Sequence, residues 1–383
     1  MPVSSYKVQG LKYYLFSFGL LSWGGGTIPG RAQTLPAADS VKIAVPASPI
    51  IFGAYAQGAI IMGHAPAVAH LVASHPTGLE LNVQRQTTGA APWHGWYHYP
   101  KVGLALVYYD YHNPVLGRSY AASVYLSKAL VRTARHDLSI RLGTGLAYFS
   151  THYDLYTNRK NNFIGAPLNA TLQTRLEYDL ALNPRLGLLV ALALNHYSNG
   201  ATAYPNFGIN LPTLLVGVNY YQARLALAPL RPGSLPADVG HTFFNFSTSL
   251  GYKQRSGDPN RYLVNSVTLA VGRRLNRKSN VLVGLEGFYD RSLLAAVLAA
   301  SSPGDRPDVK KASGFVGHEL LFGQLALVTH LGLYYYNPYQ SNPFYYERVG
   351  LKYQFTNRLF GAIDLKAHGA IADVVEFKAG VKL

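Results

Sequence analysis

The chain has 383 residues, of which 49% are hydrophobic and 13% aromatic, and 34 lysines and arginines against 18 acidic residues give a formal net charge of +16. Only 14% of the residues are charged, which is too few for a disordered basic protein. The absence of cysteine excludes disulfides, thiolate metal sites and a cysteine nucleophile, so any catalysis must use serine, histidine, carboxylates or a metal with nitrogen and oxygen ligands.

The first segment of the chain has the composition of an export signal. Lys7 and Lys12 precede an apolar run at residues 13–21, and Gly30-Arg31-Ala32 offers small residues for cleavage. We predict a cleaved signal peptide over residues 1–32, with an uncleaved N-terminal anchor as the alternative. Downstream of it, no uncharged apolar run reaches the roughly 18 residues that a spanning helix needs.

From about Gly78 onward, apolar and polar residues alternate in segments separated by Gly, Pro, Asn and Asp, which is typical of β-strands. The clearest segment is 168–179, where one face is mostly apolar and the other is polar. A soluble β-sandwich would alternate too. Strands of about ten residues with aromatic residues at their ends favour a transmembrane barrel, whose apolar face meets lipid and whose aromatic girdles lie at the membrane interfaces. Such aromatic ends occur at residues 108–109, 148–149, 220–221 and 334–336.

The connections between these segments alternate between short turns and long polar loops, as the periplasmic turns and external loops of bacterial barrels do. With residues 52–62 as an additional first strand, we expect an all-β fold in which residues 33–383 form a single antiparallel transmembrane β-barrel of about sixteen strands (range 12–16). Two connections, 88–99 and 223–240, are long where this scheme places short turns. The short connections are residues 182–184, 276–279, 323–324 and 356–357, and the long ones are 151–165, 198–210, 291–311 and 337–344.

Residues 188–198 form one of the alternating segments, and His196 and Ser198 both fall on its more apolar side. A polar pair that continues a lipid-facing stripe is unusual for a passive barrel. A serine beside a histidine is the minimal activated nucleophile, because the histidine can take the hydroxyl proton. The alternative is an interfacial histidine and serine beside an ordinary Asn199-Gly200 turn.

The pair belongs to a longer pattern, H-x-S-N at residues 196–199 followed by P-N-x-G-I at residues 205–209. This compound pattern resembles the active-site segment of the PagL-type lipid A 3-O-deacylases, the acyloxyacyl hydrolase-like family of outer-membrane barrels. The resemblance implies that Ser198 attacks the ester carbonyl of an acyl chain on lipid A, with His196 as general base. It also implies an oxyanion hole and substrate contacts from Asn199, Asn206 and Gly208.

The sequence departs from the family pattern at position 210, where the family has a glutamate that orients the histidine and this chain has Asn210. An amide can fix the tautomer of the imidazole, but it lacks the charge that stabilises the imidazolium. Glu177 reads as lumenal and Glu80 has no assigned position, so we favour neither as a substitute. Two rivals stay open: a non-catalytic channel or structural barrel of the same family, and a phospholipid esterase.

The resemblance is strong only over residues 78–221. It implies a carboxylic ester hydrolase in the outer membrane of a Gram-negative bacterium, with lipid A of lipopolysaccharide as its substrate and no need for a cofactor or metal. Export argues against a nucleic-acid partner, and the excess of positive charge suits the phosphates of lipid A. Arg159 and Lys160, on a predicted external loop, are the best candidates for that contact.

The segment His318-Glu319-Leu320-Leu321-Phe322 begins like a zinc-binding helix. It has phenylalanine where the second histidine of that motif must stand, so we do not expect a zinc site there.

Overall fold

The computed structural model describes residues 49–225, 236, 238–300, 302, 307–340, 343–369 and 371–383. The predicted signal peptide and its cleavage site lie outside these residues. No helix in the described part of the chain is long and apolar enough to cross a membrane.

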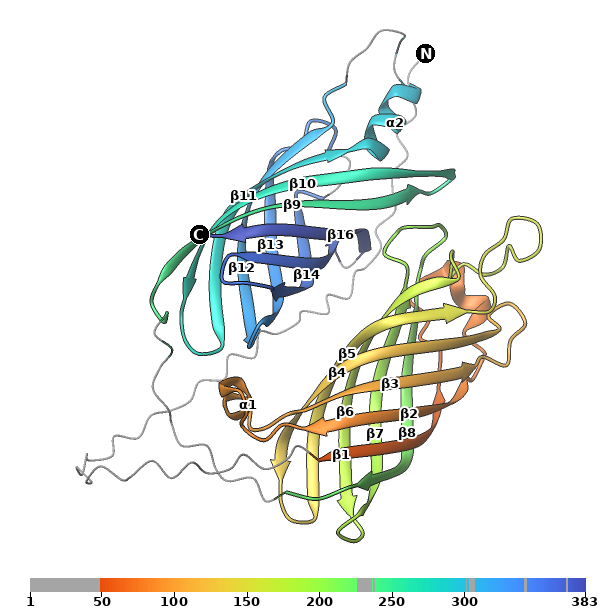
Figure 1. Ribbon diagram of the computed structural model, residues 1–383. Helices are drawn as coiled ribbons and strands as arrows, with labels where there is room; N and C mark the ends of the chain where they lie inside the picture. Colours follow the sequence, from red (N-terminus) through yellow and green to blue (C-terminus); the bar gives the residue numbers. More distant parts are fainter. Residues whose placement is uncertain are drawn as a thin grey trace. The chain divides into compact units, whose positions relative to one another are not determined.

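The first half of the chain forms a closed antiparallel barrel in which each strand pairs with the next along the chain (Figure 1). The ring closes where β8 pairs with β1, with Ile51 opposite Tyr221. A short 3-10 helix, η1 (Pro66–Leu71), follows the first strand, and helix α1 (Pro92–Trp96) follows the second. The strands are β1 (Ile50–Ala59), β2 (Thr77–Gln86), β3 (Lys101–Asp110), β4 (Arg118–Arg132), β5 (His136–Phe149), β6 (Leu168–Ala181), β7 (Leu186–Ser198) and β8 (Ile209–Tyr221).

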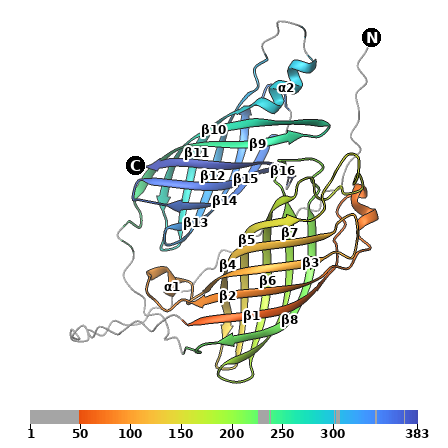
Figure 2. The same cartoon turned by 45° about the vertical axis from the view of Figure 1, so that its right-hand side comes forward.

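The second half forms another closed antiparallel barrel, in which β16 pairs back with β9 (Figure 2). Helix α2 (Arg291–Ala300) follows β11 directly. The strands are β9 (Thr242–Arg255), β10 (Asp258–Arg274), β11 (Ser279–Asp290), β12 (Lys310–Phe322), β13 (Leu325–Tyr336), β14 (Tyr345–Gln354), β15 (Leu359–His368) and β16 (Ile371–Lys382).

The all-β class, the antiparallel order and the sixteen strands of the described residues confirm the fold predicted from the sequence. The expected first strand at residues 52–62 corresponds to β1. The prediction of one barrel over residues 33–383 is wrong, because the sheet closes twice. Pairing of β8 with β1 leaves no free edge for β9, and the long connection 223–240, which broke the expected pattern of turns, joins the two barrels.

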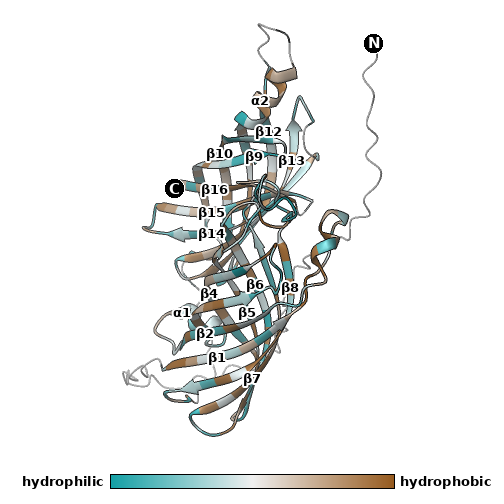
Figure 3. Cartoon of the chain, turned by 90° about the vertical axis from the view of Figure 1, so that its right-hand side faces the viewer, coloured by the Kyte–Doolittle hydropathy of each residue, from teal (hydrophilic) through white to brown (hydrophobic). Residues whose placement is uncertain are grey.

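Each barrel carries apolar side chains outside and polar side chains inside, and this alternation is visible along the strands in Figure 3. On β6, Leu168, Leu172 and Leu176 are exposed, while Thr171 and Arg175 are buried. Eight strands enclose a space that side chains just fill. Ion pairs occupy much of it: Arg141 and Arg175 bind Glu80 in the first barrel, and Arg348 binds Glu286 and Glu376 in the second.

The predicted alternation of short turns and long loops is present in the first barrel and only in part in the second, where two-residue connections also join β9 to β10 and β15 to β16 at the long-loop end. Short turns join β6 to β7, β10 to β11, β12 to β13 and β14 to β15. Longer connections leave the opposite end, among them residues 150–167 and 199–208 of the first barrel. The exception at residues 88–99 contains α1, which lies on the connection between β2 and β3. The last residues of β7 and the first of β8 therefore lie at the long-loop end.

Candidate active site

His196 and Ser198 lie at the end of β7, on the outer wall of the first barrel. Leu192 and Leu194 on the same strand are exposed, and Asn195 and Tyr197, which alternate with them, are buried towards the lumen. His196 and Ser198 continue the exposed row and are half-buried. The structure thus places both on the lipid-facing side at the long-loop end of the strand, where the sequence pattern predicts them.

The imidazole of His196 bridges Ser198 and Asn210. Its Nε2 lies 3.0 Å from Ser198 Oγ, and its Nδ1 lies 2.7 Å from Asn210 Oδ1. The register of the sheet creates this row, because His196 on β7 is directly opposite Asn210 on β8. An amide oxygen can only accept, so Nδ1 carries the proton and the lone pair of Nε2 faces the serine hydroxyl. This is the tautomer that a general base needs.

The loop after β7 folds back on itself through Asn199 and Asn206. The backbone N–H of Asn199 donates to Asn206 Oδ1 at 3.1 Å. The side chain of Asn199 is bonded to the backbone of Ala203, through Nδ2 to the carbonyl at 3.0 Å and through Oδ1 from the N–H at 3.3 Å. Asn199 is therefore used in shaping the loop. Asn206 is held by its oxygen, and in the part of the chain that the structure describes its Nδ2 donates to no partner.

Gly208 packs against the imidazole through its backbone. Its φ of +72° lies in the left-handed region that favours glycine. A Cβ added there would lie 2.9 Å from Cε1 of His196 and 3.0 Å from the carbonyl oxygen of Tyr197. Only glycine fits this position without displacing the histidine.

Two other loops hold the segment that carries Gly208, and sequence reasoning missed them. The N–H groups of Phe207 and Gly208 donate to the carbonyls of Asn162 and Phe163, at 3.3 and 3.0 Å. His64, on the loop after β1, lies 2.9 Å through Nε2 from the carbonyl oxygen of Phe207. These contacts join loops that are distant in sequence, so no local pattern predicts them.

The two carboxylates considered as substitutes for the family glutamate both face the lumen. Glu80 is fully buried and accepts hydrogen bonds from Arg141 and Arg175, and Glu177 accepts from Ser127 at 3.0 Å. His196 faces the opposite side of the barrel wall. Among the described residues, the side chain bonded to Nδ1 of His196 is therefore that of Asn210.

Arg159 and Lys160 are exposed on the connection between β5 and β6. This connection is one of the long loops, so both side chains lie at the same end of the barrel as Ser198. Arg159 Nε donates to the backbone carbonyl of Leu155 within the same loop.

An apolar hollow of about 550 Å³ lies on the outer wall beside the row of His196 and Asn210. Leu192 of β7 and Pro212 and Leu214 of β8 line one side of it, and Gly58 and Ile60 of β1 line the other. A Cβ at Gly58 would meet no atom within 4 Å, so the missing side chain opens the hollow.

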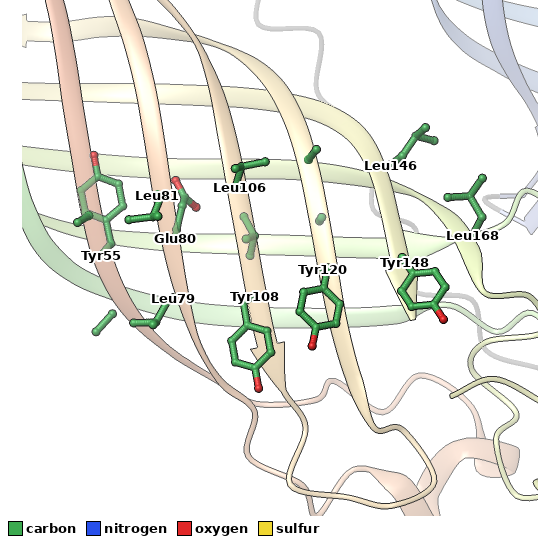
Figure 4. Close-up of a pocket in the computed structure, with 15 residues that line it drawn as sticks. Tyr55, Leu79, Glu80, Leu81, Leu106, Tyr108, Tyr120, Leu146, Tyr148 and Leu168 are labelled. Carbon is green, nitrogen blue, oxygen red and sulfur yellow. The ribbon is translucent and has the colours of Figure 1, made fainter. Parts of the chain in front are cut away.

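A larger hollow of about 880 Å³ lies on the wall formed by β1 to β6. Its lining residue Leu168 is two residues from Ala170, which is opposite Ser198 in the sheet. Figure 4 shows its outward leucines, with Tyr108, Tyr120 and Tyr148 gathered towards one end of the strands. These tyrosines include positions at which the sequence predicts an aromatic girdle.

Two family models match the chain, one on each barrel. The model described as lipid A 3-O-deacylase (PagL) matches residues 77–219, and the model described as acyloxyacyl hydrolase, C-terminal domain, matches residues 242–383. The first range contains Ser198, His196 and Asn210. No curated protein matches the chain.

Solved structures of other outer-membrane proteins resemble the chain only distantly. The outer membrane enzyme PagL is 18% identical, with 43% of this chain and 97% of that chain covered and a TM-score of 0.28. CdiB from Acinetobacter baumannii is 11% identical, with 87% and 60% covered and a TM-score of 0.19. The toluene transporter TodX of Pseudomonas putida is 6% identical, with 88% of each chain covered and a TM-score of 0.19.

The family assignment therefore rests on the two sequence models, which between them cover most of both barrels. The chain belongs to the PagL-type lipid A 3-O-deacylase family of outer-membrane β-barrels, the acyloxyacyl hydrolase-like family.

Proposed function

We propose that this protein is an outer-membrane lipid A deacylase that hydrolyses an ester-linked acyl chain with Ser198 as nucleophile and His196 as base. The observation that carries the proposal is the hydrogen-bonded row Ser198, His196 and Asn210 on the lipid-facing wall, within the range matched by the deacylase model. In outer-membrane barrels the long loops are external. The row would thus meet the outer leaflet, where lipid A resides.

In the first half of the reaction, Ser198 Oγ attacks the ester carbonyl carbon while its proton moves to Nε2 of His196. The ester C–O bond then breaks, and the sugar oxygen takes the proton from Nε2 as it leaves. In the second half, water attacks the acyl-serine ester and gives a proton to the same nitrogen, which returns it to Ser198 as the fatty acid departs. Asn210 holds the imidazole in the required tautomer throughout.

Asn206 is the best candidate to stabilise the oxyanion. Its amide is oriented by the N–H of Asn199, the residue after the nucleophile, and its Nδ2 retains a hydrogen to donate. A donor that is fixed before the reaction stabilises developing charge without reorganisation and typically contributes about 10²–10³ in kcat. The other contacts of the loop support this role by restraining both asparagines.

The surroundings of the row suit a lipid with acyl chains and an anionic headgroup. The hollow beside Gly58 is lined by apolar groups on the lipid-facing wall and would accept an acyl chain. Arg159 and Lys160 would contact the phosphates at the external surface. Both features favour lipid A over a soluble ester.

The identity of residue 210 affects the kcat that we expect for the deacylation. The neutral amide positions His196 but does not stabilise the imidazolium that forms as Ser198 attacks. We therefore expect Asn210→Glu to increase kcat and Asn210→Ala to decrease it.

The test measures release of fatty acid from purified lipopolysaccharide and, separately, from phospholipid vesicles by wild type, Ser198→Ala, Asn210→Glu and Asn210→Ala. We expect lipid A to lose one acyl chain with wild type, more slowly with Asn210→Ala and not with Ser198→Ala. Activity confined to phospholipid would establish the esterase rival instead. No activity from folded wild type on either substrate would favour the non-catalytic barrel, and activity that appears only in Asn210→Glu would locate the defect at that residue.

A further inference from the structure

A second serine and histidine are hydrogen-bonded on the outer wall of the second barrel. Ser279 is the first residue of β11, and its Oγ lies 3.1 Å from Nε2 of His318 on β12. Both side chains fall in outward rows: Val281 and Val283 continue the row of Ser279, and Val316 shares the row of His318. The pair therefore ends an exposed apolar stripe, as His196 and Ser198 do on the first barrel.

The Ser279 pair lies beside a short turn of its barrel, and the Ser198 pair lies beside a long loop of the other barrel. Ser279 directly follows the short turn between β10 and β11, whereas Ser198 precedes a long loop. In outer-membrane barrels the short turns are periplasmic. The Ser279 pair would accordingly meet the inner leaflet, whose lipids are glycerophospholipids, and not the outer leaflet with its lipid A.

On the lumenal side of the sheet, hydrogen bonds join the residues next to Ser279 and His318. Asn280 and Glu319, the neighbours of Ser279 and His318 in sequence, are joined by a hydrogen bond of 2.8 Å. Lys352 binds the other oxygen of Glu319 at 2.8 Å. These lumenal contacts restrain β11 and β12, the two strands that carry the pair. Such restraint suits a site whose side chains must keep a fixed geometry.

A cation lies beside the pair on the same outer face. Arg273 on β10 is exposed and opposite Val281 in the sheet, and Val281 is in turn opposite His318. Within the residues that the structure describes, the Arg273 guanidinium makes neither a hydrogen bond nor an ion pair. A guanidinium at this position would bind a phosphate through two parallel hydrogen bonds.

We propose that Ser279 and His318 form a second esterase site, which cleaves an acyl ester of a glycerophospholipid whose phosphate binds Arg273. Ser279 Oγ bonds to the ester carbonyl carbon while its proton moves to Nε2 of His318. The C–O bond to glycerol breaks, the glycerol oxygen takes that proton, and a lysophospholipid leaves. Water then attacks the acyl-serine ester, and the fatty acid is released as the proton returns to Ser279 through His318.

The second pair lacks one element of the first. Nδ1 of His318 has no acceptor among the described residues, whereas Nδ1 of His196 is bound by Asn210. The His318 ring is therefore less constrained, and we expect slower turnover at Ser279 than at Ser198.

The experiment uses the full chain with Ser198→Ala, so that the second site is measured independently of the first and of the function proposed for it. The folded protein is treated with a fluorophosphonate probe, and the adduct is mapped by peptide mass spectrometry. Release of fatty acid from vesicles of phosphatidylethanolamine and phosphatidylglycerol is measured in parallel. We expect an adduct on Ser279 and slow release of fatty acid.

The variants identify the groups responsible. Adding Ser279→Ala should abolish both signals, and adding His318→Asn should slow adduct formation at least roughly 100-fold, since a general base contributes that much. Arg273→Gln should raise KM for the vesicles with little change in kcat. Ser247→Ala, at a buried lumenal serine of β9, is the matched control and should change neither signal. No adduct on Ser279 in the folded protein, or equal release of fatty acid with Ser279→Ala, would overturn the proposal.

Discussion

Gly208 places the backbone of the loop directly against His196, the proposed general base. Replacement by alanine would place a Cβ 2.9 Å from Cε1 of His196 and force the ring away from Ser198 or Asn210. A misplacement of a catalytic group by about 1 Å can lower kcat by about 10²-fold. We expect Gly208→Ala to fold, as judged by heat-modifiable gel mobility, and to lose most of its lipid A deacylation.

Gly257 provides the control for Gly208→Ala. Its φ of +80° is close to the +72° of Gly208, but a Cβ there meets no atom within 4 Å. Gly257→Ala therefore carries a similar backbone cost, about 1–2 kcal/mol, without a clash at the site. Equal activity of the two alanine variants would show that Gly208 does not position His196.

The residues of the site differ in how far the sequence predicts them. The outward positions of His196 and Ser198 follow from the alternation along one strand. The hydrogen bond from His196 to Asn210 needed the family resemblance, because it depends on the register between two strands. The support from His64 and Asn162 had no sequence signal, since both act through backbone contacts between loops that are far apart in the chain.

The strands of the first barrel are tied together inside the lumen by Glu80 on β2 with Arg141 on β5 and Arg175 on β6. Removing one cation from a buried network leaves an underpaired carboxylate, at a cost of about 3–5 kcal/mol. We expect Arg175→Met to lower the free energy of unfolding of the barrel by about that amount. The measurement is urea unfolding in detergent micelles, followed by circular dichroism.

Arg118 on β4 provides the control for Arg175→Met, because its ion pair with Asp110 is exposed. Its Nε lies 3.1 Å from Asp110, but the arginine side chain is 58% exposed. Exposed ion pairs contribute little to stability because water and salt screen them, so Arg118→Met should have little effect on the free energy of unfolding. The variant Glu80→Met/Arg175→Met removes both charges, keeps Arg141 beside Glu177, and should be more stable than Arg175→Met alone. Equal losses for Arg175→Met and Arg118→Met would mean that the buried network does not hold the strands.

The lengths of the connections were a reliable guide to the strands. Turns of two to four residues, such as 323–324 and 275–278, occur where the sequence places them, because each polar interruption of the alternation has room only for a hairpin. The connection 223–240 was the informative exception. Its length marks the point where the chain leaves one barrel and enters the next.

The described residues form two closed barrels, in each of which every strand pairs on both sides. Such closure removes the exposed edges that would require a partner strand, so each barrel should fold without the other. We expect residues 1–240, and residues 241–383 placed behind the signal segment 1–32, each to give a heat-modifiable band in outer membranes. Failure of both fragments, with a heat-modifiable full chain, would indicate that the barrels depend on each other.

The number of barrels was beyond what the alternation could predict. A strand of an eight-stranded barrel and a strand of a sixteen-stranded barrel have the same alternating pattern, because both face lipid on one side and polar groups on the other. What distinguishes them is whether β8 pairs with β1 or with β9. Ile51 and Tyr221, which are paired in the sheet, come from the first and last strands of this barrel and are far apart in the sequence. No local sequence feature predicts that pairing.

The most direct measurement is the mass spectrum of lipid A from cells that express the wild-type chain or Ser198→Ala, with both shown to be folded in the outer membrane. If Ser198 is the nucleophile of a lipid A deacylase, lipid A from the wild-type cells loses one acyl chain and lipid A from the Ser198→Ala cells does not. Identical spectra from the two strains, in cells whose lipid A carries the susceptible ester, would contradict the proposed function.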